Sequence, residues 1–95
     1  MKWHIVLEIR FHGDPDSVEA ALDSIMEQLV DADVEAPAIG ASLLEGAAEV
    51  EFLVEAGSLE EAHQRARHIA EEVVELPLES ELIGESTRRA ELVPA

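Results

Sequence analysis

Side chains able to bind a metal or transfer a proton alternate with apolar residues near the start of the chain. Within WHIVLEIRFH, residues 3–12, these side chains are His4, Glu8, Arg10 and His12. A strand rises about 3.3 Å per residue, so the two histidines stand roughly 26 Å apart and cannot share one ion. His4 and Glu8 are about 13 Å apart for the same reason. We therefore expect no metal and no cofactor on this segment.

Two further histidines occur near the middle of a helical segment. His63 and His68 are five residues apart, which separates them by about 140° around a helix axis. They do not form the i, i+4 pair of a helical metal motif. His63 can approach Glu60 or Arg67 on the same helix, because residues three or four apart are neighbours there. The spacing predicts an exposed, charged helix surface.

Residues for nucleophilic catalysis are not arranged as a catalytic site requires. The chain has no cysteine, which excludes thiolate nucleophiles, disulfides and cysteine-based metal sites. Ser17 and Ser58 are better explained as helix-start residues than as nucleophiles. The sequence contains no nucleophile elbow, phosphate-binding loop or dinucleotide fingerprint. We expect a protein that is not an enzyme.

Charge limits the partners that the chain can bind. Its 22 Asp and Glu residues against 6 Lys and Arg residues give a net charge of −16, which repels nucleic acid and anionic membranes. No apolar run approaches the length of a membrane span. We therefore expect a cytoplasmic protein with no direct contact to nucleic acid or membrane. Self-repulsion also predicts that stability rises with salt.

The elements that position these residues follow from hydrophobic periodicity. Alternation with period two predicts strands, and apolar residues at helical spacing predict helices. Asp16 with Glu19, and Ser58 with Glu61, have the spacing of capping boxes. Gly46 lies at the tight connection of a predicted hairpin. The expected strands are 3–12, 38–45, 48–56 and about 81–93, and the expected helices are 15–31 and 58–75.

This β-α-β-β-α-β order is typical of the ferredoxin-like fold. We expect one α+β domain over residues 1–95, built as a two-layer sandwich. Its four-stranded antiparallel sheet has the order 4-1-3-2, with both helices on one face. A short internal repeat agrees with a fold of two similar halves, because SVEAA at 17–21 is similar to SLEEA at 58–62.

This topology leaves the second sheet face open to water, a ligand or another chain. We expect a small interaction or assembly domain that forms a homodimer through this face or a sheet edge, or that binds another protein. Arg10 is expected to pair across strands with Glu49, Glu51 or Glu55. The predicted interface residues are Val6, Glu8, Arg10, Leu44, Glu51 and Leu53.

Other uses of the architecture remain as alternatives. RNA-recognition modules need exposed aromatic side chains on the central strands, and the outward positions here carry none. The HGDPDSVEAAL turn is similar to the strand-to-helix turn where ACT regulatory modules bind amino acids, which implies a small-molecule sensor. The negative charge allows a third use, a nucleic-acid mimic that occupies the basic groove of a partner.

Overall fold

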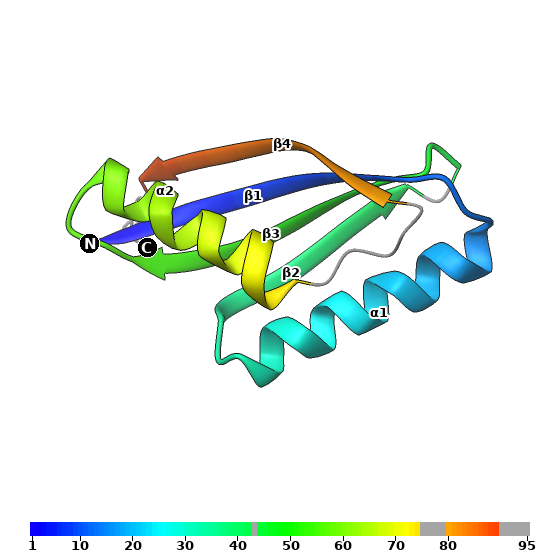
Figure 1. The fold of residues 1–95 in the computed structure, drawn as a ribbon, viewed down its shortest axis with the longest axis horizontal. Coiled ribbons are helices and arrows are strands. Elements are labelled where there is room, and N and C mark those ends of the chain that lie inside the picture. The colour runs from blue at the N-terminus through cyan, green and yellow to red at the C-terminus, as the bar shows by residue number, and fades with distance from the viewer. Residues whose placement is uncertain (43, 75–79, 90–95) are drawn as a thin grey trace, which may run out of the picture.

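The described part of the chain forms a four-stranded antiparallel sheet and two helices, as expected from the periodicity. The computed structural model describes residues 1–42, 44–74 and 80–89. The strand order is β2-β3-β1-β4, which is the predicted order read from the other edge (Figure 1). The elements are β1 Lys2–Phe11, α1 Pro15–Asp31, β2 Glu35–Ser42, β3 Ala47–Glu55, α2 Leu59–His68, the π-helical turn η1 Ile69–Val73, and β4 Ser80–Arg89.

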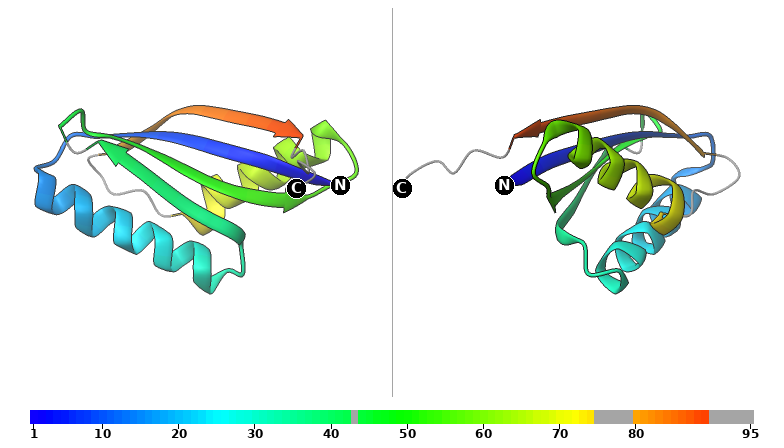
Figure 2. Two further views of the ribbon diagram at one scale, coloured as in Figure 1. Left: turned by 180° about the vertical axis from the view of Figure 1, so that it is seen from behind. Right: turned by 60° about the vertical axis from the view of Figure 1, so that its left-hand side comes forward.

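The core lies between the helices and one face of the sheet. Alternate side chains of β1 and β3 point inward, while α1 and α2 both pack on that face (Figure 2). Among the described residues no polar or charged side chain is buried. The core is therefore held by apolar burial, each large side chain contributing about 1.5–3 kcal/mol. Its buried residues include Trp3, Ile5, Leu7, Ile9, Phe11, Val18, Leu22, Ile25, Leu29, Val50, Phe52, Val54, Ala62 and Ala66.

Side-chain caps determine where both helices begin. Ser58 caps α2 as predicted, its Oγ accepting from the Glu61 backbone N–H at 3.2 Å. The cap predicted for α1 from Asp16 and Glu19 is wrong, since the N-cap is Asp14. The Asp14 carboxylate accepts from the backbone N–H of Ser17 at 2.9 Å. Pro15, whose nitrogen has no hydrogen to donate, stands at the first helical position.

β1 and β3 are each displaced by one residue from the expected bounds, and three other elements differ by more. β2 begins at Glu35, not 38, because a register shift between Glu35 and Ala38 lets this edge strand pass Pro37. α2 is α-helical only to His68 and continues as the π-helical turn. β4 covers 80–89, and residues 90–93 of the predicted last strand lie outside the described residues.

Candidate functional site

The sheet face opposite the helices presents the outward side chains of β1 and β3 side by side. The register pairs His4 with Leu53, Val6 with Glu51, Glu8 with Glu49, and Arg10 with Ala47. No helix in the described part of the chain lies on this face (Figure 2). Val6 and Leu53 are half-buried without a covering layer, so they form a small apolar centre among charged side chains.

The structure brings five of the six predicted interface residues onto this open face, namely Val6, Glu8, Arg10, Glu51 and Leu53. Leu44 is the exception, because it lies in the turn between β2 and β3 and its side chain is fully exposed. The turn ends beside Gly46, at the end of the sheet rather than on its face. Leu44 is thus separate from the apolar centre.

Charges on the open face are arranged differently from the predicted cross-strand pairs. Arg10 lies opposite Ala47 on β3 and Glu81 on β4. Two carboxylates, those of Glu8 and Glu49, face each other directly across β1 and β3. Like charges in that relation are destabilising.

A histidine lies beside a carboxylate elsewhere on this face. The Nε2 atom of His4 lies 3.5 Å from Oε1 of Glu51. The face therefore has an acidic region around Glu8 and Glu49 and a histidine region two pleats away.

A β-bulge in β4 shapes the acidic region. The β1–β4 register shifts between Glu8 and Ile9, which leaves Ile83 as the additional residue on β4 with 45% of its surface exposed. A Cβ atom on Gly84 would meet Glu8 Oε2 at 3.0 Å, so the carboxylate lies against this glycine. Glu8, Glu49 and Ile83 line a shallow hollow of about 350 Å³.

One group of chemistry-bearing side chains joins α2 to β4. His63 Nδ1 is 3.3 Å from Glu85 Oε1 and 3.2 Å from Thr87 Oγ1. A hydrolytic triad uses the two imidazole nitrogens separately, one toward the nucleophile and one toward the carboxylate. Here both oxygens approach the same nitrogen, and the threonine hydroxyl donates to Glu85 at 3.3 Å. The group therefore links two elements, and its arrangement differs from that of a hydrolytic triad.

The sequence predictions missed this group because its members come from different elements. His63 was expected near Glu60 or Arg67, its neighbours on the helix, and its partners instead lie on β4. Alternation along β4 places Glu85 and Thr87 on the same face of the sheet, and this part of the group could be predicted from the strand pattern. The short distance from His63 on α2 to these two residues is known only once the helix is seen packed on the sheet.

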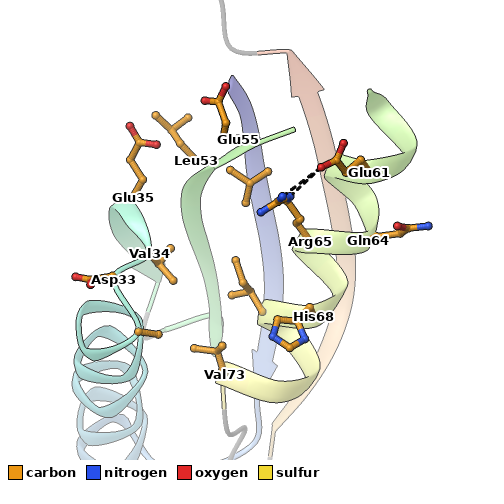
Figure 3. A pocket seen from close by; sticks show the side chains of 13 residues that line it. Asp33, Val34, Glu35, Leu53, Glu55, Glu61, Gln64, Arg65, His68 and Val73 are labelled. Carbon is orange, nitrogen blue, oxygen red and sulfur yellow. Dashed lines mark hydrogen bonds and ion pairs between the residues drawn. The ribbon is translucent and has the colours of Figure 1, made fainter. Parts of the chain in front are cut away.

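A cleft of about 660 Å³ opens where β2 separates from β3, beside α2 (Figure 3). Its apolar lining comes from Val34, Leu53, Val54, Ile69 and Val73. The charged and polar side chains around it are Asp33, Glu35, Glu55, Glu61, Gln64, Arg65 and His68. Sequence reasoning did not anticipate this cleft, since it depends on how far apart β2 and α2 lie.

An ion pair within α2 holds Arg65 over the cleft. Its Nε and Nη2 atoms donate to Glu61 Oε1 at 3.3 and 3.2 Å. The backbone N–H of Gly57 and the Arg65 guanidinium lower the pKa of Glu61 below its usual value. The carboxylate consequently stays charged at neutral pH and keeps the guanidinium directed toward β3 (Figure 3).

The described residues contain no group of three or more His, Asp or Glu side chains placed to hold a metal ion. His4 and His12 instead have separate carboxylate neighbours, Glu51 and Glu81. No helix in the part of the chain that is described is long and apolar enough to cross a membrane. Comparisons of the chain with family models, curated proteins and solved structures give no match.

Proposed function

We propose that this chain is a non-catalytic interaction domain with ferredoxin-like architecture that forms a homodimer through its open sheet face. The observation that supports this proposal is the apolar centre of Val6 and Leu53 on a face that no described helix covers. An apolar centre surrounded by polar side chains is the usual anatomy of a protein interface. Stacking a second copy on this face would remove both side chains from water.

One twofold arrangement of the two copies keeps the Glu8 carboxylates apart. A twofold axis that runs across the strands at Val6 stacks β1 of one copy antiparallel on β1 of the other. His4 of each copy then faces Glu8 of the second copy, because these residues lie two positions on either side of Val6. Each Glu8 carboxylate thus faces a histidine of the second copy instead of another carboxylate. Glu51 lies opposite Val6 in the register, so it is at the level of the axis and faces its own counterpart.

Sedimentation of the wild type and of a Leu53→Glu variant tests this interface. We expect the wild type to sediment at twice its 10.4 kDa chain mass, and Leu53→Glu to sediment as a monomer. Leu44→Glu is the matched control, since it makes the same change at an exposed turn residue and should stay dimeric. Circular dichroism verifies that each variant is folded.

Two outcomes contradict the proposed interface. A wild-type monomer at high micromolar concentration excludes a homodimer of useful affinity. A dimer that persists in folded Leu53→Glu would move the contact from the open face to a sheet edge or another surface.

The proposal also covers catalysis, the class of partner and the location of the protein. We propose no catalytic activity and no cofactor, with His63 serving as a link between α2 and β4. The charge of −16 favours protein partners over nucleic acid or membrane. It also suits the proposed cytoplasmic location, where net charge opposes precipitation.

A further inference from the structure

We infer that the homodimer proposed above is regulated by pH, because His4 takes up a proton as the two open faces meet. This inference rests on the proposed homodimer and names the regulation of that interface. Histidine side chains ordinarily change their charge between about pH 5 and pH 8, and pH-dependent interfaces use them for this reason. We therefore expect the dimer to be tighter in mild acid than at alkaline pH.

The open face is richer in carboxylates than in cationic side chains. Two such faces repel each other as they stack, whichever way round they meet. A group on the face that can gain a positive charge is therefore charged more readily in the dimer than in a separate copy. The outward positions of β1, β3 and β4 hold Glu8, Glu49, Glu51, Glu55 and Glu81, against Lys2, Arg10 and Arg88.

His4 lies between charges of both signs on this face. Its Nε2 atom is 3.5 Å from Glu51 Oε1, and 34% of its side chain is exposed. Leu53 lies directly opposite His4 on β3, and Arg88 lies directly opposite it on β4. Glu55, on the other diagonal of β3, already contacts the N-terminal ammonium at 2.6 Å. In a separate copy, Glu51 thus favours a charged imidazole and Arg88 opposes it.

The other titratable side chains of this strand are less affected by a second copy. Lys2, two positions before His4, forms an ion pair with Glu35 of β2. His12 follows β1, and its Nε2 atom is 3.6 Å from Glu81 Oε1. In the twofold arrangement the position opposite His12 would precede Met1, so His12 gains no partner from β1 of the second copy. His4 is therefore the histidine of the open face whose surroundings the dimer changes.

The second copy adds a carboxylate in front of His4. In the twofold arrangement Glu8 of the second copy faces this histidine. Stacked sheets lie about 10 Å apart, a distance that a histidine and a glutamate side chain span when they reach toward each other. A charged imidazole is then attracted by two carboxylates, its own Glu51 and Glu8 of the second copy, instead of one. The dimer consequently binds more protons than two separate copies do.

Glu51 makes the charge on His4 more important. Each Glu51 faces its own counterpart at the axis, so dimer formation brings two carboxylates together. A charged His4 beside each of them offsets this repulsion, whereas a neutral His4 does not. The state that binds more protons gains as the pH falls. The gain is complete below the histidine range and is lost as the pH rises through it.

Sedimentation equilibrium at constant ionic strength, from about pH 8 to about pH 6, tests the inference. We expect the dissociation constant of the wild-type dimer to fall at least about tenfold over this range. His4→Gln should lose this change and bind as weakly at the lower pH as at the higher. His4→Lys stays positively charged throughout, so it should dimerise at the higher pH about as tightly as the wild type does at the lower.

His63→Gln is the matched control. His63 also lies beside a carboxylate, its Nδ1 atom being 3.3 Å from Glu85 Oε1, but it belongs to α2 on the other side of the sheet. This variant should keep the full pH dependence of the wild type. Circular dichroism at each pH verifies that every variant is folded.

The outcomes separate the regulation from the homodimer itself. A wild-type dimer whose dissociation constant does not change with pH overturns the inference and leaves the homodimer intact. The same holds if His4→Gln is as sensitive to pH as the wild type. A wild type that is monomeric at every pH overturns both.

Discussion

Gly46 ends the turn between β2 and β3 in a conformation that suits only glycine well. Its φ is 65°, and its carbonyl accepts a hydrogen bond from the Phe11 backbone N–H at 2.6 Å. A Cβ atom there would stand 2.7 Å from the Phe11 carbonyl oxygen, and a backbone atom cannot move aside as a flexible side chain does. The turn therefore depends on this residue for its close approach to β1.

We expect Gly46→Ala to lower the free energy of unfolding by about 1–3 kcal/mol. Gly40→Ala is the matched control, since a Cβ at Gly40 meets nothing within 4 Å, and its effect should stay within about 1 kcal/mol. Urea denaturation of both variants measures the difference. Equal stability of the two variants would show that the turn tolerates a side chain.

Asp14 provides a second prediction at the residue scale. Hydrogen bonds from Ser17, the backbone N–H first and the hydroxyl second, hold the pKa of this carboxyl below its usual value of 3.8. A lowered pKa in the folded state stabilises the protein above pH 3.8 and loses that contribution as the pH falls through the folded-state value.

An Asp14→Asn variant isolates this effect, because asparagine also caps helices but does not titrate. We expect the wild type to be more stable than Asp14→Asn at pH 7, and the difference to shrink below about pH 4. Thermal denaturation of both proteins from pH 7 to acid measures it. A difference that does not change with pH would contradict the role of the charged carboxylate.

At the scale of elements, α1 carries a line of exposed carboxylates with no positive residue between them. Glu19, Asp23, Glu27 and Asp31 follow one another at i, i+4 spacing and are all exposed. Like charges at this spacing destabilise a helix by about 0.2–0.5 kcal/mol per pair. α1 is therefore stabilised by its packed apolar side and its N-terminal cap, and the charged side opposes it.

Replacing one member of this line should stabilise the protein. Glu27→Lys converts two repulsive pairs, with Asp23 and Asp31, into attractive ones, for an expected gain of roughly 1 kcal/mol at low salt. Thermal denaturation at low and at molar salt measures the gain and its screening. A gain that persists undiminished at high salt would show a cause other than charge.

At the scale of the whole molecule, a net charge of −16 on 95 residues opposes compaction. Screening lengths fall to about 8 Å at physiological ionic strength, so added salt weakens repulsion between carboxylates that are far apart. We expect the melting temperature of the wild type to rise by a few degrees between low and moderate salt, and by less for Glu27→Lys. A flat or falling curve would contradict this expectation.

The periodicity of apolar residues along the chain was sufficient to predict most of the strands and helices. The alternation of residues 3–12 correctly predicted the inward row of β1, and the spacing of Val18, Leu22, Ile25 and Leu29 correctly predicted the buried side of α1. These patterns succeed because a strand has period two and a helix has period 3.6, whatever surrounds them. The order of elements then limited the sheet to few topologies.

Features that depend on more than one element were harder to predict. The sequence indicated which residues of β1 and β3 point outward, and five of the six candidate interface residues lie there. It did not indicate the register that places Glu8 against Glu49 and Arg10 against Ala47. Leu44 was misplaced because β2 ends at Ser42, so this residue lies in the turn that leads to β3.

The amino-acid sequence by itself determined the element types, the inward faces and the acidity, since each follows from neighbours along the chain. Only the tertiary structure decided the cleft beside Arg65 and the contact of His63 with Glu85 and Thr87. The cleft and the His63 contact each bring together residues that are more than twenty positions apart in the sequence. Their distances depend on sheet register, on the bulges and on how α2 packs, and these are set by the balance of contacts across the whole fold.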